Sequence, residues 1–184
     1  MQRKRMILSL LTAILVTLCF AQAAPDFGAS PAKKGSIGIG YGIPYGGLGV
    51  NGDVFFGDNL ALTVGIGSFG YTAGYELGAK YFYGSPAKTW RPLAVVLYGI
   101  NGVLMLEGET QDIREAFSGI SAGLGSQFLF GKNKHHGFDL GVLYILTSGV
   151  FKRMEELEDD GYSFADTNRF SCYLGYRYAF NLKF

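Results

Sequence analysis

The sequence predicts an all-β fold, an eight-stranded antiparallel up-and-down transmembrane β-barrel, and two observations carry this prediction. The first is alternation: eight segments, each about 9–14 residues long, place an apolar residue at every second position. The second is composition, because 28 Gly, 12 Tyr and 15 Phe without a collagen-like repeat are typical of many short strands that close into a barrel. Successive side chains of a strand point to opposite faces, so each segment has one apolar face and one face of small or polar residues.

The first 23 residues are predicted to be a secretory signal peptide rather than part of the fold. A positively charged start at residues 3–5 precedes an apolar stretch over residues 6–20 and an A-x-A motif at residues 21–23. The apolar stretch is shorter than the ~20 residues that a membrane-spanning helix needs. The predicted organisation is a signal peptide (1–23), a polar periplasmic lead-in (24–34) and one barrel domain (35–184).

The barrel domain contains the eight predicted strands, which are separated by turns and loops. Their ranges are 35–43, 47–56, 60–68, 73–83, 92–104, 117–130, 138–148 and 170–184. Residues 44–46 are predicted to turn the chain between the first two strands. Segment 92–104 is apolar on both faces and contains Gly99, Asn101 and Gly102, so we interpret it as a strand, either regular or bulged. An even number of strands places both chain ends on one side, with four outward loops and three inward turns.

A soluble barrel is the structural alternative, because it also alternates but turns its apolar face inward. Here the apolar faces are continuous, whereas the opposite faces carry Gly, Ser, Asn and charged residues that would not fill a soluble core. Such faces are typical of the lumen of a membrane barrel. With the carboxy-terminus on the periplasmic side, aromatic residues of the apolar faces gather at periplasmic strand ends, as an interfacial girdle requires. These residues are Phe56, Tyr81, Tyr83, Phe128, Phe130, Phe138, Phe180 and Phe184.

The last predicted strand ends on an aromatic residue, and its apolar face carries Tyr176, Tyr178, Phe180, Leu182 and Phe184. This pattern resembles the assembly signal of bacterial outer-membrane β-barrels. Together with the eight strands, it makes residues 35–184 similar to the small outer-membrane barrels of the OmpA/OmpX type. The resemblance implies a Gram-negative-type outer membrane, contact with its lipid and lipopolysaccharide, and the barrel-assembly machinery as a partner. It implies no cofactor. The chain departs from this family in the large number of its inward glycines, which indicates that its lumen is filled differently from that of the OmpA/OmpX-type barrels.

The net charge and the cysteine content argue against a nucleic-acid-binding protein and against a disulfide-stabilised one. A net charge of +1 gives no basis for binding nucleic acid. Cys19 is removed with the signal peptide, and Cys172 then remains alone on an apolar strand face, so no internal disulfide is expected.

Five charged residues are predicted to face the lumen, where an unpaired charge is costly and must find a partner or trapped water. Glu76 and Lys80 share one strand face, and Asp139 and Arg177 are predicted to face each other. The set is either a static polar core or a gate on a narrow path. Its members are Asp53, Glu76, Lys80, Asp139 and Arg177.

An inward apolar cluster is predicted near the periplasmic end. An eight-stranded interior is just wide enough to be filled by side chains or to hold one small ligand. The cluster is therefore either a plug of side chains or part of a passage for a hydrophobic ligand. Its members are Phe55, Phe82, Leu93, Val95, Leu97 and Leu129.

Two charged loops, 105–116 and 149–168, are predicted to face outward and are the candidates for a partner contact. In the second loop, basic residues are placed to meet lipid phosphates and acidic residues to bind a divalent cation, although the whole segment is equally a solvated loop. The candidates are Lys152, Arg153, Glu155, Glu156, Asp159 and Asp160.

His135 and His136 are the two histidines, and they lie between the sixth and seventh predicted strands. Adjacent histidines without further ligands make a poor metal site, so a solvated turn is expected. They lie at the periplasmic end, away from the place where lipid-modifying barrels carry a Ser/His/acid set, so no enzyme is predicted.

The sequence favours a non-enzymatic barrel with a structural or surface-interaction role. A narrow channel, or a carrier for a small hydrophobic solute, is the alternative.

Overall fold

The computed structural model describes residues 35–106, 113–131, 133–159, 162 and 168–181. The predicted signal peptide, the lead-in and the final residues Leu182 and Phe184 lie outside the described residues. The elements are β1 (Gly35–Gly42), η1 (Ile43–Tyr45), β2 (Gly47–Phe56), β3 (Leu60–Ser68), β4 (Ala73–Phe82), β5 (Trp90–Leu106), β6 (Ile113–Phe130), β7 (His136–Ile145), α2 (Gly149–Asp159) and β8 (Phe170–Phe180).

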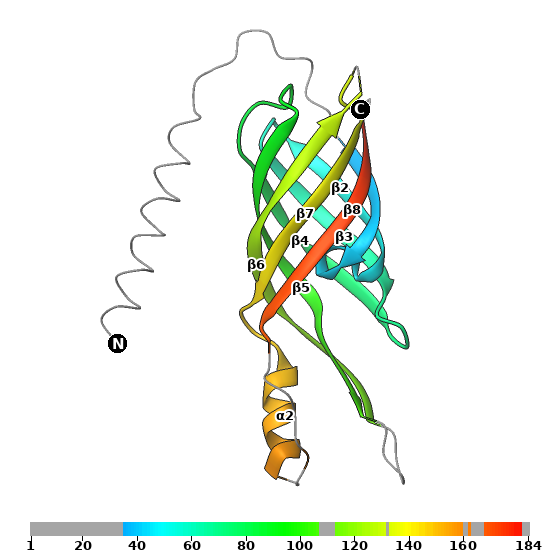
Figure 1. Cartoon of the computed structure of the whole chain (residues 1–184), viewed down its shortest axis with the longest axis vertical. Coiled ribbons are helices and arrows are strands. Elements are labelled where there is room, and N and C mark those ends of the chain that lie inside the picture. Colours follow the sequence, from blue (N-terminus) through cyan, green and yellow to red (C-terminus); the bar gives the residue numbers. More distant parts are fainter. Residues whose placement is uncertain (1–34, 107–112, 132, 160–161, 163–167, 182–184) are drawn as a thin grey trace, which may run out of the picture.

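The eight strands form one closed antiparallel barrel in sequence order, and β8 pairs with β1 to complete it. The predicted all-β, up-and-down fold is therefore confirmed. Gly35 at the start of β1 lies opposite Phe180 at the end of β8, so both chain ends leave the barrel on one side, which we call the terminal end. The opposite side, called the loop end, carries α2 and the far ends of the paired strands β5 and β6 (Figure 1).

The outer surface of the barrel is apolar, and its interior holds charged and polar residues together with aromatic and aliphatic ones. Ile39 and Leu174 are 59% and 58% exposed on the outer face, whereas Arg177 on the inner face is fully buried. Every strand alternates in this way, and the predicted assignment of faces is confirmed along the barrel wall. A barrel with exposed Ile, Leu and Val outside and charges inside has the arrangement of a transmembrane barrel rather than a soluble one.

The predicted bounds of the outward loop 105–116 are wrong at both ends. β5 and β6 continue as a paired hairpin beyond the barrel as far as Leu106 and Ile113, which are opposite each other. The pairing continues because apolar residues of this hairpin have a surface to cover, namely one side of α2. The bulge considered for β5 is present, since its register with β6 shifts between Ile100 and Gly102.

The predicted loop 149–168 is also wrong over its first part, because Gly149–Asp159 form α2. Val150 and Leu157 lie about two turns apart on one helix face and pack with Leu104 of β5. No helix among the described residues is both long and apolar enough to cross a membrane.

Several predicted strand ends shift by smaller amounts. β1, β4 and β7 end at Gly42, Phe82 and Ile145, before the predicted residues 43, 83 and 148. β8 is described as far as Phe180, and its predicted end at residue 184 lies outside the described residues. The shortening of β1 has a structural cause, because Ile43 begins η1 and the chain leaves the barrel wall.

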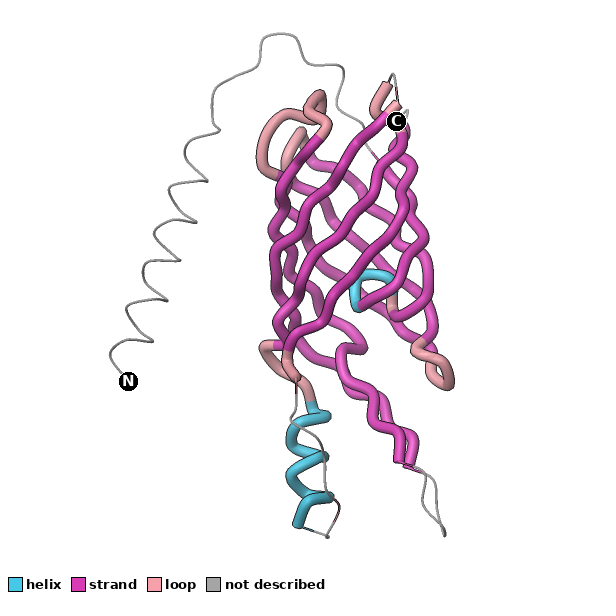
Figure 2. The backbone as a smooth tube through the Cα atoms, viewed as in Figure 1, coloured by secondary structure: helices cyan, strands magenta, loops and turns pink. Residues whose placement is uncertain are grey.

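The predicted turn at residues 44–46 does not lie on the surface. Ile43, Pro44 and Tyr45 form η1, which is buried, and Tyr45 is only 1% exposed. Figure 2 shows η1 within the length of the barrel rather than beyond the loop end. Gly46 follows η1 with φ 65°, a left-handed conformation that glycine adopts at little cost and that returns the chain to β2.

Candidate functional site in the barrel lumen

Four charged side chains from four strands form one network across the lumen. Asp53 on β2 pairs with Lys80 on β4 at 3.0 Å and with Arg177 on β8. The Nε atom of Arg177 lies 2.6 Å from Oδ2 of Asp139 on β7, so the predicted pairing of these two residues is confirmed. Two positive and two negative charges balance within the network, which is the condition under which charges are tolerated in a buried site.

Neutral polar residues complete this network. Asn51 Oδ1 accepts hydrogen bonds from Lys80 Nζ at 3.0 Å and from Arg177 Nη2 at 3.2 Å. Asn51 Nδ2 donates to Thr63 Oγ1 at 2.8 Å, and Gln127 Nε2 donates to Asp139 Oδ1 at 3.3 Å. An ion passing through the lumen would have to break several of these contacts, so the network acts as a cross-brace between strands.

Glu76, the fifth predicted lumen charge, is buried but does not join the network. It is 2% exposed, and no described residue donates a hydrogen bond to either of its carboxylate oxygens. Lys80, which shares a strand face with Glu76, reaches across the lumen to Asp53.

The predicted apolar cluster fills the terminal end of the lumen. Phe82, Leu93, Val95 and Leu97 belong to one buried core, and Phe55 packs against it with a ring-centroid distance of 5.4 Å to Phe82. Leu129, the sixth predicted member, is also buried. Of the two interpretations of this cluster, the structure favours a plug of side chains over a passage.

The inward glycines accommodate side chains of the chain itself rather than a ligand. A Cβ atom added to Gly40 would lie 2.8 Å from Cε2 of Tyr45, and one added to Gly175 would overlap the Tyr45 hydroxyl. On the neighbouring strand β7, a Cβ atom on Gly141 would lie 2.7 Å from Cε1 of Tyr173. Tyr45 and Tyr173 belong to the same buried core as the apolar cluster.

Sequence reasoning missed that η1 enters the lumen and that Tyr45 helps to plug it, because residues 44–46 were interpreted as an ordinary turn. Asn51 Nδ2 holds it in place by donating a hydrogen bond of 2.9 Å to the Pro44 carbonyl. The sequence did contain a signal for this arrangement: the turn Ile43-Pro44-Tyr45 is apolar, and the strands around it carry glycines at inward positions.

The predicted solvated turn is wrong in part, because His136 begins β7, whereas His135 lies in the turn before it. Both are half-buried, and Nδ1 of His135 lies 2.6 Å from the Ala179 carbonyl oxygen. His136 belongs to β7 and interacts through Nδ1 with the Tyr176 hydroxyl. The rings of His135 and Tyr178 stack with centroids 5.6 Å apart, which places the histidines within the aromatic girdle at the terminal end.

The basic candidates of the second predicted loop are engaged within the protein. Arg153 on α2 pairs with Glu115 on β6 at 3.0 Å and with Glu156 at 3.3 Å, and Lys152 lies 3.6 Å from Glu156. Hydrogen bonds to Glu115 and then Glu156 raise the pKa of Arg153 above its usual value. Arg153 therefore ties α2 to the hairpin.

The acidic candidates of this segment do not gather into a metal centre. Glu155 and Asp159 are exposed on α2, and Asp160 lies outside the described residues. Over the described part of the chain, no group of three or more His, Cys, Asp or Glu side chains is placed to hold a metal ion.

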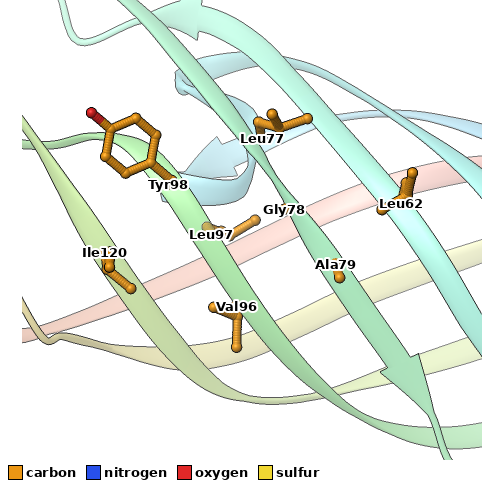
Figure 3. Close-up of a pocket in the computed structure, with 8 residues that line it drawn as sticks. All are labelled: Leu62, Leu77, Gly78, Ala79, Val96, Leu97, Tyr98 and Ile120. Atoms are coloured by element: carbon orange, nitrogen blue, oxygen red, sulfur yellow. The ribbon is translucent and has the colours of Figure 1, made fainter.

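A shallow apolar groove of about 500 Å³ lies on the outer face of the barrel, not in the lumen. Figure 3 shows its walls, formed by side chains of β3, β4, β5 and β6 around Gly78 and Ala79. Leu77 and Tyr98 in these walls are exposed outward. The groove is therefore part of the surface that contacts hydrocarbon.

The chain matches no known protein-family model and no curated protein. Among solved structures, it is similar to the crystal structure of the N-terminal β-barrel domain of Pseudomonas aeruginosa OprF. The TM-score is 0.57 at 12% sequence identity, and the match covers 81% of this chain and 98% of that domain. The expected resemblance to small eight-stranded barrels of the OmpA type is thus confirmed at the level of the fold.

Proposed function

We propose that this chain is an outer-membrane β-barrel protein of a Gram-negative-type bacterium that holds a structured element at the cell surface without catalysing a reaction. The observation that carries the proposal is the filled lumen. η1 enters it from the loop end, the charge network crosses its middle, and the apolar cluster fills the terminal end. The barrel then serves as an anchor, and what it presents lies at the loop end.

The presented element consists of α2 and the β5–β6 hairpin, and its parts are fixed to each other. Leu104, Val150 and Leu157 form a buried cluster outside the barrel, and the Arg153–Glu115 pair closes one side of it. Elements that project from a rigid scaffold commonly carry binding. The expected neighbours are outer-membrane lipid and lipopolysaccharide, with the barrel-assembly machinery as the partner during insertion. Export through a cleaved signal peptide belongs to the same proposal.

A narrow channel is the second candidate, and one observation favours it. η1 carries no charged residue, and it is held in the lumen by the packing of Tyr45 in the buried core and by the Asn51 hydrogen bond to the Pro44 carbonyl. Its departure would open the loop-end part of the lumen down to the charge network, and a full path would then require the apolar cluster to rearrange. A lipid-modifying enzyme is disfavoured, because both histidines are engaged in the girdle at the terminal end.

Conductance across a planar bilayer separates the first two candidates. The folded wild-type barrel is expected to be silent, and Tyr45→Ala is expected to stay silent as well, because the charge network and the apolar cluster still fill the lumen without that ring. Tyr41→Ala, on the outer face of β1, is the matched control. Steady openings of the wild type that change with Arg177→Ala would establish a channel and end the anchor proposal.

Cysteine labelling in intact cells tests which end faces outward. In a Cys172→Ser background, Lys152→Cys on α2 is expected to react with a membrane-impermeant maleimide in intact cells. Lys88→Cys, in the β4–β5 turn at the terminal end, is expected to react only after the cells are broken. Both positions are exposed, so accessibility within the protein is matched. Reversal of the two results would refute the orientation.

A further inference from the structure

The surroundings of Glu76 are unusual because its neighbours in the barrel wall carry no side chains. Gly65 on β3 lies opposite Glu76 on one side, and Gly99 on β5 lies opposite it on the other. The next position in the same row is Gly119 on β6, which pairs with Gly99. The Pro44 carbonyl of η1 lies over Gly65 on one side of the buried carboxylate, whereas Gly99 and Gly119 leave room for side chains on the other side.

Oxygen-bearing groups occupy this space. A Cβ atom added to Gly99 would lie 2.6 Å from Oε2 of Glu76, so the carboxylate lies over Gly99. A Cβ atom on Gly119 would lie 2.9 Å from Nδ2 of Asn101, so the amide of Asn101 lies over the next glycine. Because Gly99 and Gly119 are cross-strand partners, the two side chains are neighbours.

The orientation of the Asn101 amide is fixed by its contacts. Nδ2 donates to the Thr147 carbonyl oxygen at 2.9 Å and to Ser121 Oγ at 3.1 Å. The opposite orientation would set two oxygens against each other at Thr147, because a carbonyl only accepts hydrogen bonds. Oδ1 of Asn101 is thereby left without a partner, although the residue is only 6% exposed.

Glu76 and Asn101 together hold three buried acceptor oxygens, and no described residue donates a hydrogen bond to any of them. Within the described part of the chain, no lumen cation is left to neutralise Glu76, since Lys80 and Arg177 are engaged with Asp53 and Asp139. Arg91, the remaining buried cation, donates to the Asp58 carbonyl and lies over the Phe82 ring, about 26 Å from Gly99 along β5 at ~3.3 Å per residue.

We propose that Glu76 and Asn101 bind a small monovalent cation, with Na⁺ as the best match. Carboxylate and amide oxygens are the ligands that hard cations take from proteins, and water completes the coordination shell. One positive charge neutralises the single carboxylate, whereas a divalent ion would leave an unbalanced charge in a buried site. A water molecule satisfies the acceptors but does not neutralise a carboxylate, and a proton is the competitor of the cation for the charge of Glu76.

The bound cation has a structural consequence at the loop end. It links β4 to β5 and, through Asn101, to β6 and the Thr147 carbonyl. Gly102, next to Asn101, lies against Ser148 and Val150, where α2 begins. Cation binding therefore stabilises the base from which the hairpin and α2 project.

The test compares urea unfolding of the folded barrel in NaCl and in choline chloride at equal ionic strength, because choline is too large for the site. The wild type is expected to be more stable in NaCl, with an unfolding equilibrium constant about tenfold lower when Na⁺ is at ten times its dissociation constant. Glu76→Gln keeps the shape of the side chain and should lose this difference. Asp159→Asn, which removes an exposed carboxylate of α2, should keep it.

Equal stability of the wild type in the two salts, or a difference that survives in Glu76→Gln, would overturn the proposal. Asn101→Asp provides a second readout, because it adds a carboxylate at the site. This variant is expected to be stabilised by CaCl₂ beyond the wild-type response, and a response equal to the wild type would also count against the site. If Asn101→Asp does not fold, the comparison with Glu76→Gln alone decides.

Discussion

Replacing Gly175 with alanine tests whether the Tyr45 ring occupies the lumen. Gly175 faces inward on β8, and the three heavy atoms nearest to an added Cβ there all belong to the Tyr45 side chain. Tyr45 is only 1% exposed, so its ring has little room to move away from the added group. The extra methyl group therefore overpacks the lumen, and we expect Gly175→Ala to lower the free energy of unfolding by about 1–3 kcal/mol.

The same substitution should be harmless once the ring is gone. Tyr45→Ala alone removes a buried aromatic side chain, which costs about 3–5 kcal/mol. In that background the Gly175→Ala methyl group enters vacated space, and its cost falls to about zero or becomes a gain of ~0.5 kcal/mol from the stiffer unfolded chain. The two positions should therefore show a coupling energy of about 1–3 kcal/mol.

The measurement is a double-mutant cycle by urea unfolding in phospholipid vesicles, followed by the fluorescence of Trp90, the single tryptophan, and by heat-shifted gel mobility. Gly52→Ala is the control, since no atom lies within 4 Å of a Cβ added there. Additive effects of Gly175→Ala and Tyr45→Ala would refute the reasoning, because they would mean that the ring and the added methyl group do not meet.

Two further predictions concern the network and the outer face. Asp53→Asn leaves Lys80 and Arg177 without their shared carboxylate, so it should cost about 3–5 kcal/mol in the same unfolding assay, and a cost below ~1 kcal/mol would contradict a buried pairing. Val64→Arg places a charge at the middle of the outer face of β3 and should cost about 2–4 kcal/mol in a bilayer, whereas Ser68→Arg, on the same face at the end of that strand, should cost only about 0–1 kcal/mol. Equal costs at the two positions would contradict the membrane placement of β3.

Much of the barrel was predictable because alternation is a local property. β2 and β3 begin and end at the predicted residues, and all eight strands are where the pattern placed them. The site was predictable in part: inward parity identified every member of the charge network, and Asp139 and Arg177 meet as expected. The choice of Asp53 rather than Glu76 as the partner of Lys80 was not predictable, since it depends on contacts across the lumen.

The sequence by itself determined the alternating faces, and with them the strands, the apolar outside and the polar inside, because side-chain direction in a strand follows from its twofold repeat. Only the tertiary structure decided what fills the lumen. Tyr45 and the glycines opposite it are far apart in sequence, and their complementarity arises when β8 closes on β1. Closure also isolates Glu76 from the other charges, because hydrogen-bond partners in a barrel are assigned by the register of whole strands rather than by spacing along one of them.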